Sequence, residues 1–334
     1  MMWIRILFSC TALRNRGSNH WARLLLVLLF ATPFSSQAES VGPPGITARA
    51  VVLMNADTGE IVFSRQPYRR LPNASTTKVL TSLLTMERIN PNARMLVSAG
   101  AANTPPSRLG LKKGESLTTQ DLLYGLMLKS GNDAAEVIAE AIGGSVAGFA
   151  NLMNIRARQI GARNSHFRNP HGLPDDNHYS TAYDQAVIFR YAMRNPLFAE
   201  LVRTRSASLR IQTPKSRDGW RTLAVRNSNR LLGSFEGARG GKTGYTFKAK
   251  RCFVGEVSRG GTRLIVAVLG STQLWGDVKA LFDYGFSQHE QILAAKRESR
   301  VSAFEATVNF DTMRESDESE IADPFFAKRK LGSS

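Results

Sequence analysis

The chain has 334 residues, of which 43% are hydrophobic and 21% charged, and its formal net charge is +17. This composition is typical of a globular protein with one large or two small domains, and it excludes a disordered tail protein, a collagen and a polytopic membrane protein. The two cysteines, Cys10 and Cys252, are too few for a zinc cluster or a disulfide framework, so we expect chemistry from oxygen and nitrogen side chains without a metal or other cofactor.

Residues 1–38 have the pattern of a secretory signal peptide. Four arginines, with no acidic residue among them, precede an apolar run over 24–31, and small residues follow at Ser36-Gln37-Ala38. The run is far shorter than the roughly 20 residues of a membrane-spanning helix. A buried N-terminal helix is the alternative, but it fits poorly with the basic residues in front of the run. We therefore expect an exported protein of the periplasm or cell envelope.

A β-hairpin is predicted at the start of the mature chain. Residues 48–56 are apolar enough for a strand, Asp57-Thr58-Gly59 supplies a tight turn, and residues 60–64 return. Helical spacing then runs from Ser75 to Met86. Further helical stretches are predicted at 117–129, 133–142, 147–160 and 181–193.

Strand character returns near the C-terminus. A short strand is predicted around 242–245, and a hairpin joins 251–257 to 262–269, before a closing helix over 275–286. Strands at both ends with helices between them predict an α+β fold, in which the N- and C-terminal strands share one sheet. Residues 291–334 are predicted to be a charged, flexible tail, and Phe325-Phe326 is too short an apolar segment for a membrane-surface helix.

Three short motifs occur once each and in a suggestive order. Ser75-Thr76-Thr77-Lys78 places a hydroxyl and an amine one helical turn apart on one face. Ser130-Gly131-Asn132 lies between two predicted helices, and Lys242-Thr243-Gly244 lies on a late strand. Alone, each has an ordinary explanation as a capping serine, a turn or a strand segment. Together they are the motif set of penicillin-binding proteins and related β-lactamases.

Longer stretches strengthen this similarity. They are Ser130-Gly131-Asn132-Asp133-Ala134-Ala135, Asn169-Pro170-His171-Gly172-Leu173, His178-Tyr179-Ser180-Thr181-Ala182 and Gly241-Lys242-Thr243-Gly244-Tyr245-Thr246. Over about residues 45–287 the chain resembles the serine D-Ala-D-Ala carboxypeptidases, the low-molecular-mass penicillin-binding proteins. The resemblance implies a penicillin-binding protein/β-lactamase-like fold, with an antiparallel sheet, a helical subdomain and a catalytic domain over 45–290.

The resemblance also implies catalytic roles. Ser75 would form the acyl-enzyme, Lys78 would take its proton, and Ser130 would relay a proton toward the leaving amine. A serine hydroxyl needs a base within hydrogen-bond reach, and Lys78 can serve only when neutral. Lowering a lysine pKa from about 10.4 toward 7 requires roughly 4–5 kcal/mol, which burial and a second cation, Lys242, would supply.

Substrate-binding roles follow in the same way. Asn132 would orient the catalytic lysine and hold the substrate amide, while Lys242 and Thr243 would bind the terminal carboxylate. The backbone N–H groups of the nucleophile and of Tyr245 would stabilise the oxyanion. Gly244 would allow the strand to approach the substrate closely.

One position departs from the family pattern. After K-T-G the family usually has Thr, two variable residues, Ala and Gly, whereas this chain has Lys250 in place of the last glycine. A positive φ or close packing there would strain a lysine. The alternative is that the Lys250 side chain projects toward an anionic wall polymer.

Other hydrolase classes lack their motifs in this sequence. A β-lactamase would carry E-x-x-L-N between the second and third motifs, a Ser-His-Asp hydrolase G-x-S-x-G, and a zinc peptidase H-E-x-x-H, and none is present. We therefore expect His166, His171 and His178 to be structural.

The expected partner is peptidoglycan. Even without the arginines of residues 1–38 the chain is strongly basic, which favours an anionic partner, although a solvated basic surface without a specific role is the alternative. Nucleic acid is not expected, because no aromatic-studded basic motif is present. We expect trimming of stem pentapeptides, with β-lactams as covalent inhibitors. Cleavage of D-Ala–diaminopimelate cross-links by an endopeptidase and a non-catalytic wall-binding or penicillin-sensing protein remain the alternatives.

Overall fold

A computed structural model describes residues 44–214 and 216–319. The predicted signal peptide lies outside them, as does the Phe325-Phe326 pair of the tail.

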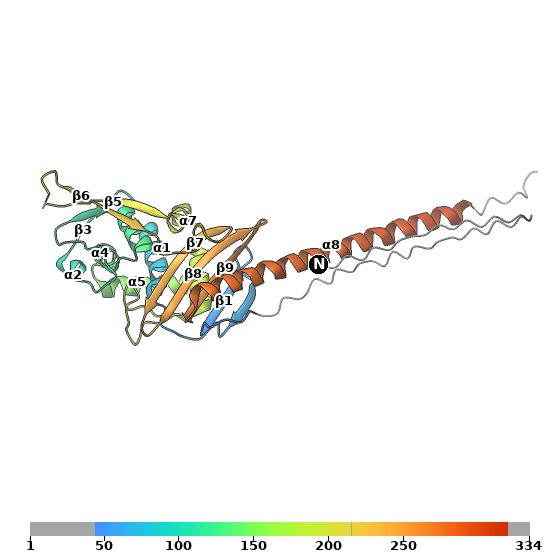
Figure 1. The fold of residues 1–334 in the computed structure, drawn as a ribbon, viewed down its shortest axis with the longest axis horizontal. Coiled ribbons are helices and arrows are strands. Elements are labelled where there is room, and N and C mark those ends of the chain that lie inside the picture. The colour runs from blue at the N-terminus through green and yellow to red at the C-terminus, as the bar shows by residue number, and fades with distance from the viewer. Residues whose placement is uncertain (1–43, 215, 320–334) are drawn as a thin grey trace, which may run out of the picture. The chain divides into compact units, whose positions relative to one another are not determined.

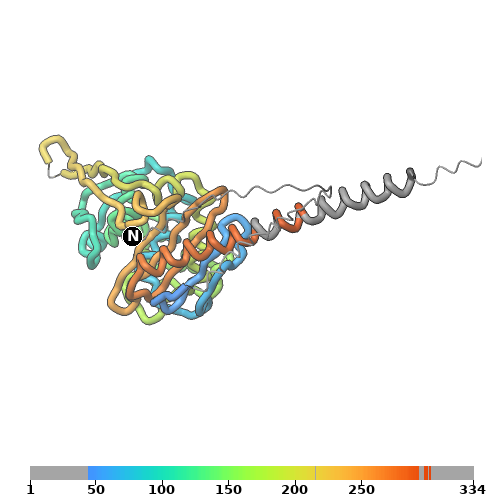
Figure 2. The backbone as a smooth tube through the Cα atoms, turned by 45° about the vertical axis from the view of Figure 1, so that its right-hand side comes forward, coloured from blue at the N-terminus to red at the C-terminus, as the bar shows by residue number. Residues whose placement is uncertain are grey.

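A five-stranded antiparallel sheet joins the two ends of the described chain. Its strand order is β2-β1-β9-β8-β7. The strands are β1 (Ala50–Asn55), β2 (Ile61–Arg65), β7 (Ala238–Thr246), β8 (Lys250–Arg259) and β9 (Thr262–Ser271). Strand β1 pairs with β9, and the two lie side by side in both views (Figures 1 and 2). The predicted α+β layout and both predicted hairpins are therefore confirmed.

The period of two along β1 explains why this sheet is covered on both faces. Ala50, Val52 and Met54 are buried in one apolar cluster, which includes side chains of α1 and α6. Val51 and Leu53 are buried in the other, with side chains of the last helix. Because successive strand residues face opposite sides, an unbroken apolar run indicates a sheet packed between two layers of helices.

The helices between the strands build the second part of the fold. They are the 3₁₀ turn η1 (Ala74–Thr77) and α1 (Lys78–Arg88), α2 (Ala99–Ala102), α3 (Thr119–Leu128), α4 (Asn132–Gly143), α5 (Val146–Gln159), α6 (Ala182–Ala192) and α7 (Pro196–Arg203). Side chains of Thr118, Ser145 and Thr181 accept backbone N–H bonds at the starts of α3, α5 and α6. These caps fix the helix starts close to the predicted positions.

A second, four-stranded sheet was not predicted. Its order is β3-β4-β5-β6, formed by β3 (Arg94–Leu96), β4 (Ser116–Thr118), β5 (Ser206–Gln212) and β6 (Trp220–Arg226). Strand β4 takes the first two residues of the helix predicted over 117–129, so α3 starts two residues later, at Thr119. Only Leu209 and Ile211 are buried in β5, and two inward apolar residues are a weak alternating signal.

The last helix is longer than predicted. Helix α8 spans Leu274–Ser319, so the predicted end at Phe286 is wrong. The helix thus runs through much of the segment that was predicted to be a charged, flexible tail, and its flexibility stays a prediction. The first turns of α8 pack on the sheet through Val278, Leu281 and Phe282, next to β9 and β8 in Figure 1. Within residues 44–214 and 216–319, no helix combines the length and apolar character needed to cross a bilayer.

Candidate active site

The predicted motifs converge on one cleft beside β7, an edge strand of the five-stranded sheet. The cleft has a volume of about 440 Å³. Its lining includes Ser75, Ser130, Asn132, Thr243, Gly244 and Tyr245. The two lysines of the motifs, Lys78 and Lys242, are buried. Residues separated by up to 170 positions in the chain are thus brought together as the sequence predicted.

Ser75 and Lys78 meet across the junction between η1 and α1. The Lys78 Nζ lies 3.0 Å from Ser75 Oγ. The same amine donates to Asn132 Oδ1 at 2.7 Å and to the backbone oxygen of His171 at 2.9 Å. The helical spacing of the S-x-x-K motif therefore delivers a hydroxyl–amine hydrogen bond, and two further residues fix the amine in place.

The three partners of Lys78 match a neutral amine. Two of them are carbonyl oxygens, which only accept, whereas the Ser75 hydroxyl can donate. A neutral amine has two N–H groups and one lone pair, so it satisfies this set with the lone pair directed at Ser75. Complete burial lowers the pKa of Lys78 well below its usual value, and the cation of Lys242 lowers it further, against an opposing contribution from Asp133.

Asn132 is held from both sides. Its amide nitrogen donates to the backbone oxygen of Pro105 at 2.9 Å, while its Oδ1 accepts from Lys78. These two contacts fix the amide orientation. A flipped amide would place its nitrogen against the Lys78 amine and its oxygen against the Pro105 carbonyl, and neither pair would match. Asn132 is the first residue of α4, so the helix fixes the position of its side chain in the cleft wall.

The next residue, Asp133, is a structural anchor outside the predicted site. Its buried carboxylate accepts the backbone N–H groups of Leu109, Gly110 and Leu111 at 2.9–3.1 Å. It thereby ties the 109–111 loop to the start of α4. A buried carboxylate with this many donors is well stabilised.

Ser130 stands in a backbone conformation that usually belongs to glycine. It follows α3 with φ of 65°, and the N–H of Gly131 bonds the carbonyl of Gly125 at 3.1 Å. This bond closes the chain over the end of α3, and Ser130 takes the left-handed conformation that often follows a helix C-terminus. A non-glycine residue there costs roughly 1–2 kcal/mol. The strain places its hydroxyl in the cleft lining.

The opposite wall comes within contact distance of Ser75 because of Gly244. A Cβ added to this residue would lie 2.9 Å from the backbone nitrogen of Ser75 and 3.1 Å from the Cβ of Ala74. A larger residue would push β7 away from η1. Gly244 therefore lets β7 lie against η1, while its predicted role in close approach to the substrate stays a prediction. The backbone of Tyr245 follows directly at the cleft.

The rest of the K-T-G motif lies along the same strand. Lys242 is buried, donates to the backbone oxygen of Thr243 at 2.9 Å, and has a pKa lowered to about 7 by burial. The Thr243 hydroxyl lies 2.6 Å from the hydroxyl of Ser228. Ser228 also lines the cleft but was not predicted, because a serine in a polar loop carries no motif.

Two of the three histidines that were predicted to be structural, His171 and His178, hold the loop beside Lys78 through buried contacts. His178 accepts the N–H of Arg168 at Nδ1, so its Nε2 donates to Thr77 Oγ1 at 2.9 Å, and burial lowers its pKa to about 3. His171 accepts the N–H of Leu173 at Nδ1 and lies 3.3 Å from Glu136 through Nε2, and burial lowers its pKa as well. Both rings are neutral supports of the loop behind Lys78.

The departure at Lys250 falls at a strained position. Its φ is 57°, so the condition under which a lysine would be strained is met. Its Nζ lies 4.3 Å from the centre of the Phe247 ring. The contact is within the range of a cation–π interaction.

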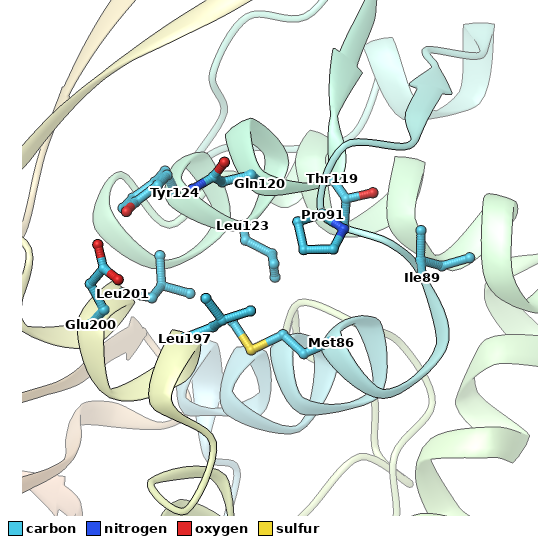
Figure 3. A pocket seen from close by; sticks show the side chains of 10 residues that line it. All are labelled: Met86, Ile89, Pro91, Thr119, Gln120, Leu123, Tyr124, Leu197, Glu200 and Leu201. Atoms are coloured by element: carbon cyan, nitrogen blue, oxygen red, sulfur yellow. The ribbon is translucent and has the colours of Figure 1, made fainter.

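A smaller cavity lies elsewhere, between α1, α3 and α7 (Figure 3). Its volume is about 90 Å³, and apolar side chains such as Met86, Leu123 and Leu201 dominate its lining. It shares no lining residue with the cleft and pairs no nucleophile with a base. We therefore assign the chemistry to the cleft beside β7.

Known proteins share this chain's sequence pattern. A family model described as D-alanyl-D-alanine carboxypeptidase matches residues 37–273. The chain is 34% identical to D-alanyl-D-alanine carboxypeptidase DacF of Bacillus subtilis, over 76% of this chain and 66% of that protein. It is 37% identical to D-alanyl-D-alanine carboxypeptidase DacB2 of Mycobacterium tuberculosis, over 76% of this chain and 87% of that protein.

Solved structures show the same fold. A D-alanyl-D-alanine carboxypeptidase of Mycobacterium tuberculosis has a TM-score of 0.69 at 35% identity, over 75% of this chain and 95% of that one. A DD-transpeptidase of Streptomyces has a TM-score of 0.70 at 32% identity, over 74% of this chain and all of that one. The predicted penicillin-binding protein type of fold is confirmed.

Proposed function

Because the chain belongs to the D-alanyl-D-alanine carboxypeptidase family of serine peptidases, we propose that it removes the terminal D-alanine of peptidoglycan stem pentapeptides through an acyl-enzyme on Ser75. The observation that carries this proposal is the buried amine of Lys78, 3.0 Å from Ser75 Oγ and bonded otherwise only to acceptors. This arrangement supplies the neutral base that a serine nucleophile needs.

In the first step Ser75 gives its proton to Lys78 and its oxygen attacks the carbonyl between the two D-alanines. The new C–O bond produces an oxyanion, which the backbone N–H groups of Ser75 and Tyr245 stabilise. Collapse breaks the C–N bond, and a proton passes through Ser130 to the leaving amine of D-alanine. Water, with Lys78 again as base, then hydrolyses the ester and restores Ser75.

Recognition uses the exposed edge of β7. An edge strand offers free backbone groups to an extended peptide, and Gly244 keeps that edge close to the nucleophile. Lys242 and Thr243 bind the terminal carboxylate of the substrate. The cleft lining contains Lys129 and Arg251 but no carboxylate side chain, which suits an anionic peptide.

β-Lactams fit the same chemistry as covalent inhibitors. Attack by Ser75 opens the lactam ring, and the amine that would leave stays attached to the acyl group. It therefore blocks the approach of water to the ester. The proposal also includes export after residues 1–38, which N-terminal sequencing of the secreted protein tests by a start at Glu39.

Muropeptide mass analysis tests the proposal. Pentapeptide-rich, cross-linked sacculi are incubated with the purified protein and, in parallel, with Ser75→Ala. We expect monomeric pentapeptides to lose one alanine with the wild-type protein alone. Cross-linked dimers falling to monomers would instead assign an endopeptidase. No change with either protein would contradict the enzyme and favour a wall-binding or penicillin-sensing role.

A further inference from the structure

The turn between β7 and β8, residues 246–250, continues the wall of the cleft beyond the K-T-G motif. We call it the rim hairpin. Thr246 and Arg251, at its two ends, both line the cleft. The Thr246 hydroxyl accepts the N–H of Ala249 at 3.0 Å, and Lys248 forms an ion pair with Asp176 at 2.6 Å across the cleft-side loop. The bond within the turn fixes the rim hairpin, whereas the ion pair joins two exposed side chains and contributes little to its position.

An aromatic residue and a cation are exposed together on the rim hairpin. Phe247 is 82% exposed, and the Nζ of Lys250 lies 4.3 Å from the centre of its ring. An aromatic side chain that is this exposed adds little to the stability of the fold. Exposed aromatic residues next to a cleft are instead frequent anchors for ligands.

Lys250 occupies a backbone conformation that favours glycine. At φ of 57° a glycine would avoid roughly 1–2 kcal/mol of strain. Among the described residues its neighbour Lys248 has a carboxylate partner, whereas no ion pair involves Lys250. The strained residue therefore keeps its charge available to a ligand.

The direction in which the substrate peptide runs along β7 brings the residues before its C-terminal alanines to Phe247 and Lys250. Under the proposed function, the terminal carboxylate lies at Lys242 and Thr243, and the scissile carbonyl, one residue earlier in the peptide, lies at Tyr245. The rest of the peptide therefore continues toward Phe247. The four residue steps from Thr243 to Phe247 span about 13 Å of extended chain, which is the length of three to four peptide residues.

We propose that Phe247 and Lys250 form an accessory subsite for a carboxylate that the stem peptide carries three to four residues before its C-terminus. This inference rests on the proposed function. The ring packs against the peptide and holds the ammonium group, which pairs with the carboxylate. The subsite selects peptides by charge and takes no part in bond cleavage.

Two synthetic pentapeptides ending in D-Ala-D-Ala test the subsite, one with a free carboxylate three residues before the C-terminus and one with a carboxamide there. Their kcat/KM values are compared for wild type, Lys250→Gln, Lys250→Arg and, as the matched control, Lys248→Gln. Lys250→Gln keeps the backbone strain and a polar, hydrogen-bonding side chain, one atom shorter than lysine, but removes the charge.

We expect wild type to prefer the carboxylate about three- to fivefold, as for an exposed charge contact. Lys250→Gln should lose this preference, Lys250→Arg should retain it, and Lys248→Gln should leave it unchanged. The rate of acylation by penicillin should be equal in all four proteins. An unchanged preference in Lys250→Gln, or its absence in wild type, would overturn the subsite.

Binding to Ser75→Ala separates this inference from the proposed function. If neither peptide is hydrolysed by wild type, the proposed function fails. The ratio of the two Kd values, measured with Ser75→Ala and with the Ser75→Ala, Lys250→Gln double variant, still decides the subsite. A ratio that falls to one in the double variant supports it, and equal ratios in both proteins refute it.

Discussion

The inner cleft and the rim hairpin differ in how their side chains meet solvent: those around Lys78 are buried, and those of the rim are exposed. Around Lys78 the polar groups are buried and matched, donor to acceptor. On the rim, Phe247 is exposed and Lys250 is strained, with its charge available to a ligand. Burial is what makes a lysine a base, whereas exposure is what lets a lysine meet a substrate. In the proposed mechanism and subsite the same residue type therefore has two roles, set by its surroundings.

Backbone strain links the two regions. Among the described residues, the non-glycine positions with positive φ are Gln66, Ala74, Ser130 and Lys250. Ala74 directly precedes the nucleophile, Ser130 lines the cleft, and Lys250 lies at its rim. Strain of this kind persists where a side chain serves a function rather than stability. Substitutions that relax it should separate stability from activity.

The largest effect is expected for Ser130→Gly. Glycine fits φ of 65° without strain, so the free energy of unfolding should rise by about 1 kcal/mol. Loss of the hydroxyl should lower kcat by roughly 10²–10⁴, the range for a lost proton-transfer group. Urea denaturation and D-alanine release measure the two quantities. A less stable variant would contradict the strain, and an active one would contradict the proton relay.

Lys242→Met should also separate stability from activity. Burial lowers the pKa of Lys242 to about 7 in the folded protein, against about 10.4 when unfolded. The unfolded state then binds more protons between pH 7 and 10.4, so the free energy of unfolding of wild type should rise with pH in that window.

Removing the amine should flatten part of this rise and stabilise the protein at pH 7, while kcat/KM falls at least tenfold because the carboxylate loses its cation. Urea denaturation at several pH values checks the first result and peptide hydrolysis the second. An unchanged pH dependence in Lys242→Met would show that Lys242 is charged throughout.

A smaller effect is expected for Asp133→Asn, which tests the scaffold of the inner cleft. The amide cannot accept all the N–H groups of Leu109, Gly110 and Leu111, so stability should fall by about 2–3 kcal/mol. Glu60→Gln, an exposed control, should change it by less than about 0.5 kcal/mol. Thermal unfolding measures both, and similar values for the two variants would refute the anchor.

The smallest effect belongs to the rim. Lys250→Gly relieves the strain at φ of 57° but adds backbone freedom to the unfolded chain. The net gain in stability should therefore be about 0.5–1 kcal/mol. The urea midpoint should rise while acylation by penicillin stays unchanged. A lower midpoint would show that the contact between Lys250 and Phe247 outweighs the strain.

The inner cleft was predictable from the sequence, whereas at the rim only Lys250 was noticed, as a departure from the family pattern. Ser75, Lys78, Asn132 and Lys242 belong to motifs whose spacing is short enough to define geometry within one helix or strand. Phe247 acts through its exposure, which no local pattern reports.

The second sheet was missed for a similar reason. Its strands are short, and β5 buries only two apolar residues. The charged sequence after Phe286 hid the continuation of α8, because its residues are not apolar enough to show a helical stripe. The long apolar strands β1 and β9, covered on both faces, were predicted correctly.

The most direct test is the pH dependence of acylation at Ser75, followed by mass spectrometry with penicillin. The central claim is that Lys78, with a pKa lowered by burial and by Lys242, is neutral and takes the proton of Ser75. The rate should rise with pH and level off well below pH 10.5, with the adduct on Ser75, and Lys78→Gln should lose it. A rate that keeps rising to pH 10.5, or an adduct elsewhere, would contradict the account.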